Sequence, residues 1–392
     1  MLKNVKFQLI QFIKHHIIYH IPIYKPNKNT LLFVSLEGIG DYILFRNFLP
    51  YLIKSNPFQV ERTIFIGNSN LKDFVERFDA NLFDEYVWVN FVQFAQMNLW
   101  QRWSYLRHNV RKYAAATVIL PTHGRLDLED LFIHSSGAIY KIASEGDDTR
   151  LGLAGKKRSD KLYQKLIPSL PTSSFQFDRN KFFFQQLINE TIPIYRTSIE
   201  SVTFKKKEHL ISLYPGASSP YRRWSAQHFA SLALLIHQEF PYFSFQILGA
   251  TWEIEKGLDI IKKLPPNFPI QSFCGKTRLD ELIEKIAESR LLISNETSGP
   301  HFAAALDVPS VCISNGNHFK RFHPYSSNMA AHSLTVYPTD DFYDERNFDY
   351  LAEQYRCWED SEKLSDINMI LPERVFHFVK KLLNTPIPAS DN

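Results

Sequence analysis

The sequence lacks the marks of several common protein classes. Its 392 residues include only three cysteines, Cys274, Cys312 and Cys357, which are far apart and form no CxxC pair. This argues against a zinc ribbon or a disulfide framework and fits a reducing compartment such as the cytoplasm. No apolar run approaches the roughly 18–20 residues that span a bilayer. A net charge of only +4 argues against a polycation that binds nucleic acid.

The first 29 residues form a segment distinct from the rest of the chain. Lys, His, Phe and Ile recur there at loosely helical spacing, without a long apolar run or a small-residue cleavage site. The segment is therefore not predicted to be a signal peptide. Two interpretations stay open. It could rest as an amphipathic helix on an anionic membrane surface, which would make a cytoplasmic protein peripheral to the inner membrane, or it could pack against the first domain.

The length of the chain fits two domains, and the 44% of apolar residues is enough for two cores. Strand and helix patterns alternate in two blocks, which predict a domain over 30–204 and a second over 205–345, followed by a helical tail over 346–392. In the first block, strand patterns precede or separate helical ones, and a charged, less regular region comes after them. We expect strands at 31–36, 63–67, 86–89 and 117–120, helices at 42–54, 71–78, 94–113 and 178–190, and irregular chain over 145–174.

The second block repeats this order. We expect strands at 210–216, 243–249, 270–275, 291–295 and 308–314, and helices at 226–240, 253–263, 279–289, 301–306 and 374–383. Alternation of this kind predicts an α/β fold with two doubly wound, Rossmann-like parallel sheets. Ligands of such sheets bind at the carboxyl ends of the strands, so the polar residues that come directly after strands are the candidates for a site.

The first candidate motif is GIGD at 38–41, between a strand and a helix. Gly38 and Gly40 permit a tight turn and a close approach of the backbone to a ligand. Asp41 then stands either in a cleft or as the N-cap of the helix, and spacing alone does not decide between them. The motif is not GxGxxG, so a nicotinamide dinucleotide is not indicated.

The second motif, PGASSPYRRW at 215–224, directly follows a strand. Gly216 permits the turn, Ser218 and Ser219 offer hydroxyl groups, and Arg222 offers a guanidinium fork for phosphate oxygens. Together they suit a diphosphate. The alternative is an ordinary loop with a solvated basic pair.

The third motif, SNETSGPHFAAAL at 294–306, runs from a strand into a helix. The N–H groups at the start of that helix can hold a phosphate, and His301 can donate to it. The alternative is a helix capped by Thr297 or Ser298, with His301 satisfied locally.

Taken together, these motifs resemble glycosyltransferase family 9, the ADP-heptose:lipopolysaccharide heptosyltransferase family. The likeness is carried by LLFVSLEGIGDYILFRNFLPYL, LYPGASSPYRRWSAQHFASLA and LISNETSGPHFAAALDVPSVCIS, in the order of the family, with weaker similarity at 118–143 and 177–187. It covers most of residues 30–325.

The resemblance implies a GT-B fold and an inverting transfer from a nucleotide-sugar that uses no metal and no other cofactor. The acceptor would be a glycolipid or oligosaccharide bound by the first domain, and the donor, such as ADP-heptose, would be bound by the second. The catalytic acid of the family falls on Asp41 and its phosphate-binding Lys near Arg222. Its donor motif falls on Glu296, Thr297, Ser298 and His301, where Glu296 replaces the commoner Asp.

Further residues complete the expected site. The donor side is expected to include Gly216, Ser218, Ser219, Arg222, Glu253 and Gly299, and the acceptor side Gly38, Gly40 and Arg125. The LDLED stretch at 126–130 is predicted to begin a helix and not to bind Mg²⁺. The basic stretch at 155–161 fits either an anionic glycolipid or a solvated loop. Alternatives for the whole chain are a transferase for another nucleotide-sugar, a sugar-nucleotide 2-epimerase, or a non-catalytic nucleotide-binding protein.

Overall fold

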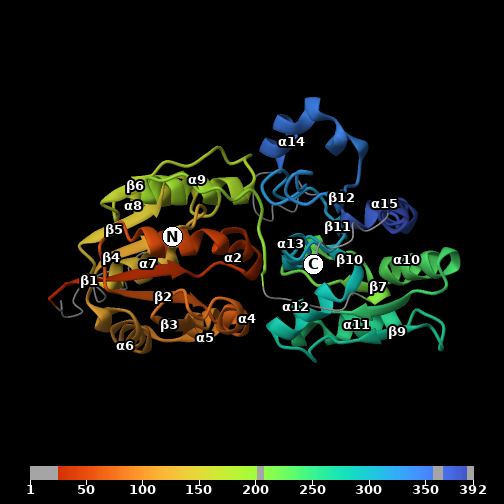
Figure 1. The fold of residues 1–392 in the computed structure, drawn as a ribbon, viewed down its shortest axis with the longest axis horizontal. Coiled ribbons are helices and arrows are strands. Elements are labelled where there is room, and N and C mark those ends of the chain that lie inside the picture. Colours follow the sequence, from red (N-terminus) through yellow and green to blue (C-terminus); the bar gives the residue numbers. More distant parts are fainter. Residues whose placement is uncertain (1–24, 201–206, 356–364, 386–392) are drawn as a thin grey trace, which may run out of the picture.

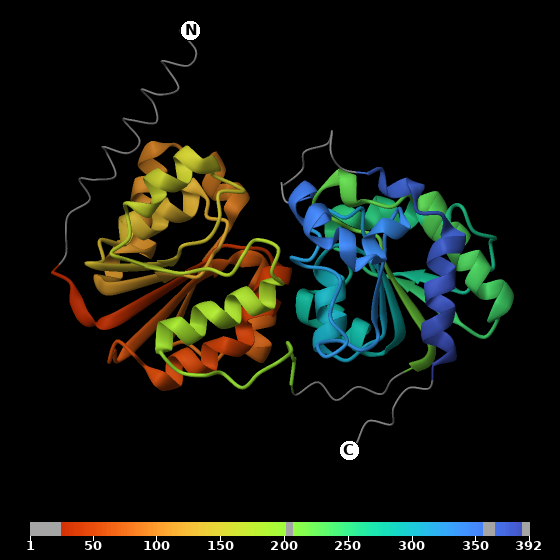
Figure 2. The same cartoon turned by 90° about the horizontal axis from the view of Figure 1, so that it is seen from above.

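A computed structural model describes residues 25–200, 207–355 and 365–385. These residues form two α/β domains that lie side by side (Figures 1 and 2). Each domain contains a six-stranded sheet with helices on both faces, and the strand pairings within both sheets are parallel. The predicted fold class is therefore confirmed. No helix within the described residues is long and apolar enough to cross a membrane.

The first domain is built on the sheet order β3-β2-β1-β4-β5-β6. Its strands are β1 (Asn27–Ser35), β2 (Arg62–Asn68), β3 (Glu85–Val89), β4 (Ala115–Leu120), β5 (Tyr140–Ser144) and β6 (Lys165–Ile167). Its helices are α2 (Ile39–Phe45), α3 (Leu49–Ser55), α4 (Lys72–Phe78), α5 (Phe91–Gln96), α6 (Leu99–Asn109), α7 (Asp127–Ser136), α8 (Gly152–Asp160) and α9 (Gln176–Ile188).

The second domain has the sheet order β12-β11-β10-β7-β8-β9. Its strands are β7 (Lys207–Tyr214), β8 (Ser244–Ile247), β9 (Ile270–Ser272), β10 (Ser289–Asn295), β11 (Ser310–Ile313) and β12 (Ser333–Val336). Its helices are α10 (Ala226–Glu239), α11 (Ile254–Ile261), α12 (Leu279–Ala287), α13 (Ser298–Ala305), α14 (Phe348–Gln354) and α15 (Pro372–Asn384). In both domains, therefore, the first strand lies inside the sheet and the later strands extend it on either side.

Several details differ from the sequence-based expectations. The region 145–174 is not irregular, because it contains α8 and β6; β5 and β12 were not anticipated either. Helix α15, in the expected helical tail, packs on α10 and on the core of the second domain. Strand β1 begins at Asn27, within the segment expected at 1–29, and residues 1–24 of that segment lie outside the described part of the chain.

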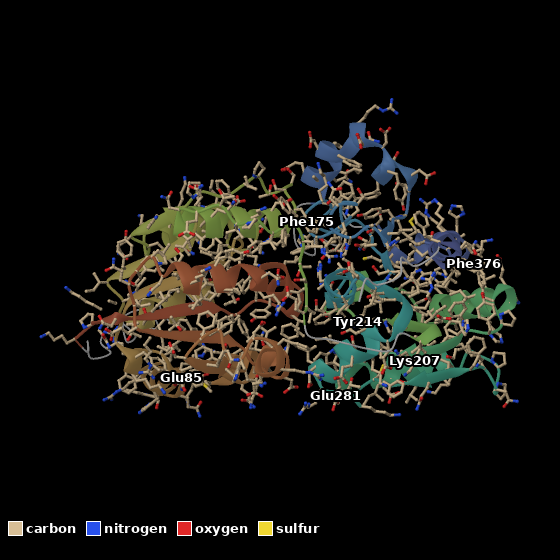
Figure 3. All side chains as sticks on the ribbon, in the orientation of Figure 1. Glu85, Phe175, Lys207, Tyr214, Glu281 and Phe376 are labelled. Atoms are coloured by element: carbon tan, nitrogen blue, oxygen red, sulfur yellow. The ribbon has the colours of Figure 1, made fainter. Side chains whose placement is uncertain are left out.

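The two domains share a hydrophobic contact. A single cluster of buried apolar residues draws from α2, α4 and α9 on one side and from α12 and α13 on the other. The rings of Phe74 and Phe302 lie 6.2 Å apart, and those of Phe175 and Tyr325 lie 4.9 Å apart. Figure 3 shows Phe175 at the junction of the domains. Arg77 adds an ion pair across the boundary, 3.4 Å from Asp280.

Helices α2 and α13 make a close contact between the domains. A methyl group built onto Gly40 would lie 2.8 Å from Cδ2 of His301, which is closer than real carbon contacts allow. Only a residue without a side chain therefore lets α2 approach α13 this closely. The two helix N-termini that carry the first and third motifs consequently meet.

Helix α2 is held in place by a buried ion pair. Asp79, at the end of α4, accepts hydrogen bonds from the Tyr42 hydroxyl at 2.8 Å and from Nε of Arg46 at 3.0 Å. Arg46 and Asp79 are 8% and 5% exposed. Because both charges have been removed from water, each depends on the other for compensation.

We therefore predict that Asp79→Asn lowers the free energy of unfolding by about 3 kcal/mol or more, because it leaves the buried Arg46 charge uncompensated. Urea denaturation would measure the loss. The matched control is Glu76→Gln, which removes the exposed Lys72–Glu76 ion pair (3.7 Å) of α4 and should change stability by less than about 0.5 kcal/mol. Equal effects of the two substitutions would contradict this account of α2.

Candidate functional site

A pocket with a volume of about 750 Å³ lies between the domains. It opens where β1, β7 and β10 end, which are the central strands of the two sheets. In sheets of this order, the direction of chain winding reverses at the central strands, and a crevice forms at their carboxyl ends. The strand order of both domains thus places all three sequence motifs around one pocket.

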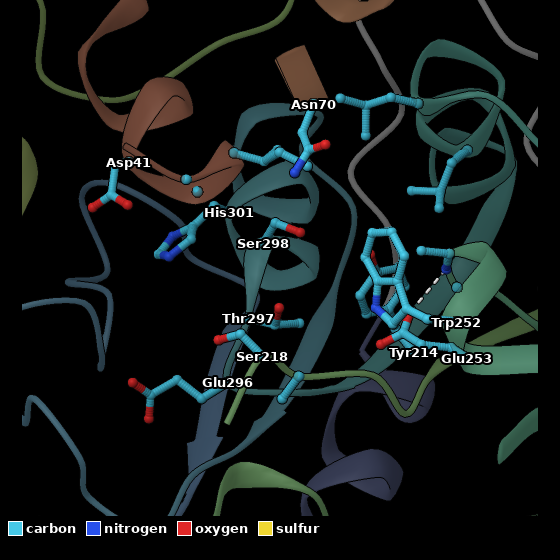
Figure 4. A pocket seen from close by; sticks show the side chains of 18 of the residues that line it. Asp41, Asn70, Tyr214, Ser218, Trp252, Glu253, Glu296, Thr297, Ser298 and His301 are labelled. Atoms are coloured by element: carbon cyan, nitrogen blue, oxygen red, sulfur yellow. Dashed lines mark hydrogen bonds between the residues drawn. The ribbon is translucent and has the colours of Figure 1, made fainter. Parts of the chain in front are cut away.

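The structure brings most of the predicted residues together in this pocket. Figure 4 shows Asp41 and His301 on one side of it and Trp252 on the other. The predicted residues that line the pocket are Gly38, Gly40, Asp41, Ser218, Arg222, Glu253, Glu296, Thr297, Ser298 and His301.

Asp41 lies half-buried in the first turn of α2, on the pocket wall. The N-cap of α2 is Gly38, so the alternative in which Asp41 caps the helix is not realised. Among the hydrogen bonds of the described residues none involves the Asp41 carboxylate, and its Oδ2 would lie 3.3 Å from a methyl group built onto Gly38.

Arg222 joins the two donor-side loops. Its guanidinium donates to the Ser218 hydroxyl at 2.7 Å and to the backbone carbonyl of Glu296 at 3.1 Å. These contacts aim a fixed positive charge at the pocket beside the N-terminus of α13. A guanidinium and a helix N-terminus together favour a phosphate group.

The His301 imidazole in the pocket wall is neutral. Burial lowers its pKa to about 3, and the nearby charge of Arg222 contributes in the same direction. Its Nδ1 lies 2.7 Å from the Tyr325 hydroxyl. When Tyr325 donates to Nδ1, the tautomer with a proton on Nε2 is favoured. His301 can therefore donate a hydrogen bond to a ligand oxygen without carrying a charge.

Two carboxylates complete the donor side. Burial raises the pKa of Glu296 to about 7, although the charge of Arg222 and a hydrogen bond from the Ser314 hydroxyl both act to lower it. Glu253 is 4% exposed and accepts a hydrogen bond from the backbone N–H of Ala250 at 2.8 Å. A methyl group on Gly216 would lie 1.6 Å from Oε1 of Glu253, so Gly216 leaves the space that this carboxylate fills.

Four predicted residues do not line the pocket. Gly216 and Gly299 pack just behind the wall, and Ser219 is 2% exposed. Arg125 is 1% exposed, forms an ion pair with Asp160 and lies over the ring of Tyr163 at 5.0 Å. Its guanidinium is engaged inside the first domain and away from the pocket, so the structure does not place it as an acceptor contact.

Other lining residues were missed by sequence reasoning. They are Ile39, Ser69, Asn70, Asp73, Arg150, Tyr214, Ala217, Gly249, Ala250, Thr251, Trp252, Thr277, Arg278, Leu279, Leu282 and Phe322. Many of them come after β2, β8 and β9, so the rule that sites form after strands could have pointed to them. Within the described ranges, no group of three or more His, Cys, Asp or Glu residues is placed to hold a metal ion.

Comparison with solved structures defines the fold of the protein. A glycosyltransferase family 9 protein of Veillonella parvula superposes with a TM-score of 0.65 at 16% identity, covering 92% of this chain and 99% of that one. An Escherichia coli heptosyltransferase with ADP superposes with a TM-score of 0.63 at 12% identity, covering 90% and 99%. The chain thus has the GT-B fold, in which two Rossmann-like domains face each other across a cleft.

Sequence comparison finds a family match within the chain. Residues 174–351 match the family described as glycosyltransferase family 9 (heptosyltransferase), the family that the motifs resemble. Lipooligosaccharide heptosyltransferase 2 of Campylobacter jejuni is 30% identical over 122 residues, which are 31% of this chain and 38% of that protein. Lipopolysaccharide heptosyltransferase 2 of Salmonella typhimurium is 34% identical over 110 residues, which are 26% and 30%. The chain thus matches roughly a third of the length of these curated relatives.

The raised pKa of Glu296 predicts a pH-dependent stability. Its carboxyl has a pKa of about 7 when folded and a reference value of 4.5, so between these values the folded chain retains a proton that the unfolded chain releases. The contribution of Glu296 to stability therefore falls as the pH rises from about 4.5 to 7. The loss is on the order of 3 kcal/mol, since one pKa unit corresponds to about 1.4 kcal/mol.

Glu296→Gln removes this titration, so the melting temperature of the variant relative to the parent should be higher at pH 8 than at pH 5. Differential scanning fluorimetry at both pH values would show it. The exposed carboxyl of Glu255 on α11 provides the control. The melting temperature of Glu255→Gln relative to the parent should be the same at pH 8 and pH 5. An identical relative melting temperature of Glu296→Gln at both pH values would refute the assignment.

Proposed function

We propose that this protein is a glycosyltransferase that moves a sugar from a nucleoside diphosphate to an acceptor hydroxyl. One observation carries the proposal: Asp41 from the first domain and Arg222, Glu296 and His301 from the second line the same pocket. A transfer needs a base on the acceptor side and positive charge on the leaving-group side. In this proposal, Asp41 supplies the base from the first domain and Arg222 the charge from the second.

The proposed reaction is a single displacement with inversion at the anomeric carbon. The acceptor oxygen forms the new bond to that carbon while its proton passes to the Asp41 carboxylate. The bond between the anomeric carbon and the diphosphate oxygen breaks, and the diphosphate leaves with the electron pair. Because Asp41 is half-buried and lies in the pocket wall without a competing partner among the described hydrogen bonds, it is available to accept that proton.

The departing diphosphate gains negative charge, which the second domain would stabilise. Arg222 is anchored by Ser218 and by the Glu296 carbonyl, so its charge is already in position before the reaction begins. The N–H groups at the start of α13 and the Nε2–H of His301 would add neutral donors. Stabilisation of this kind does not need to reorganise during the reaction, which makes it effective.

We further propose that the donor is ADP-heptose and that the acceptor is of the lipopolysaccharide type. The family description and the names of the relatives above support the heptose and the acceptor, and the Escherichia coli neighbour was solved with ADP. We also propose that transfer is independent of a metal, because Arg222 and the α13 N-terminus provide the positive charge that a divalent cation supplies in other transferases.

The role of Asp41 predicts the effect of Asp41→Asn. The amide cannot accept the acceptor proton, so turnover should fall by about 10²–10⁴-fold while affinity for ADP stays within about twofold. ADP release from ADP-heptose with heptose-free lipopolysaccharide would measure turnover, and calorimetry would measure affinity. Asp127→Asn makes the same chemical change at an exposed residue of the first domain and should leave both unchanged. Near-normal turnover of Asp41→Asn would reject the base.

Metal independence is tested with the purified protein and a chelator. Turnover should change by less than about twofold when millimolar EDTA is added. A chelator cannot remove the Arg222 side chain or the backbone N–H groups that stabilise the charge in this proposal. Restoration of lost turnover by added Mg²⁺ or Mn²⁺ would show that a divalent cation takes part after all.

A further inference from the structure

A large aromatic side chain in the pocket wall has no role in the reaction described above. Trp252 lines the pocket and is 73% exposed. Tryptophan carries one of the largest apolar surfaces of any side chain, so leaving it in water forgoes a substantial hydrophobic stabilisation. A ligand with a flat face would cover it.

The backbone beneath Trp252 is held firmly while its indole stays free. Trp252 is the middle residue of the short helix η5 (Thr251–Glu253), which comes after β8. The next residue, Glu253, is buried, accepts a hydrogen bond from the Ala250 N–H at 2.8 Å and fills the space left by Gly216. Because the backbone is fixed and an indole side chain has few rotatable bonds, ordering the ring under a stacked ligand costs little conformational entropy.

The position of Trp252 along the pocket suits the base of a nucleotide. The groups that favour phosphate, Arg222 and the α13 N-terminus, come after β7 and β10, whereas Trp252 comes after β8, on the other side of β7. Figure 4 shows Trp252 across the pocket from Asp41 and His301. In a nucleoside diphosphate the base likewise lies at the opposite end from the reacting phosphate.

We propose that Trp252 is the platform on which the base of the donor nucleotide stacks. This inference rests on the proposed function, because it requires a nucleoside diphosphate in the pocket. Stacking needs only a π face, so Trp252 supplies affinity for the base, whereas Arg222 supplies affinity for the phosphates.

Calorimetric titration with two probes, ADP and inorganic pyrophosphate, separates these contributions. Trp252→Ala should weaken ADP binding by about 5- to 150-fold, the range that aromatic stacking on a base provides. Its affinity for pyrophosphate should not change, because pyrophosphate has no base. Trp252→Phe keeps an aromatic face and should retain most of the ADP affinity.

The matched control is Trp100, which is also 73% exposed but lies on α6 and does not line the pocket. Trp100→Ala should leave the affinity for both probes unchanged, and both alanine variants should keep the melting temperature of the parent. Indole fluorescence gives a second readout: ADP should quench the parent, and Trp252→Phe should lose that quenching.

The possible failures can be told apart. If the parent binds neither ADP nor any other nucleoside diphosphate, the proposed function fails and the inference fails with it. If the parent binds ADP and Trp252→Ala binds it equally well, the stacking role is wrong and the proposed function stands. Equal losses for ADP and pyrophosphate would also overturn the stacking role, because they would show a general disturbance of the pocket.

Discussion

The site depends on the contact between α2 and α13 at Gly40. The two helices come from different domains, and they meet because Gly40 presents no side chain to the ring of His301, which a methyl group would approach to 2.8 Å. The Arg46–Asp79 ion pair holds α2 from behind, and the shared hydrophobic cluster holds α13 against it. Asp41 comes directly after Gly40 in the chain. The same close approach that joins the domains therefore also brings the Asp41 carboxylate to the pocket that the second domain lines.

The repeated sheet order explains why three separate motifs converge. Both sheets wind outward in two directions from a central pair of strands, β1 and β4 in one domain and β7 and β10 in the other. Loops after such central strands diverge and leave a crevice. With the domains side by side, the crevice edges after β1, β7 and β10 line one pocket, although the first motif is far from the other two along the chain.

Sequence reasoning found what depends on local patterns. The apolar runs and the turns after them predicted most strands, both sheets and the three motifs, because a buried parallel strand and a glycine turn each leave a local mark. It could not find what depends on partners distant in the chain. Arg125 comes after a strand as a site residue should, yet its charge is paired with Asp160 inside the domain. Trp252 and Arg150 line the pocket but lie outside the three motifs, and β5, β6 and β12 are too short or too mixed in composition to be distinctive.

The electrostatics of the pocket divide the proposed work between the domains. On the second domain, burial keeps His301 neutral and raises the pKa of Glu296 to about 7. A neutral His301 does not repel Arg222, and a protonated Glu296 carboxyl does not neutralise the charge of Arg222. The leaving diphosphate would thus meet a fixed cation and neutral donors. On the first domain, Asp41 lines the same pocket, and Arg222 donates its hydrogen bonds to Ser218 and Glu296 instead. Because the base and the cation lie on different domains, neither domain alone holds the proposed reaction centre, and whatever sets the α2–α13 contact also sets the distance between them.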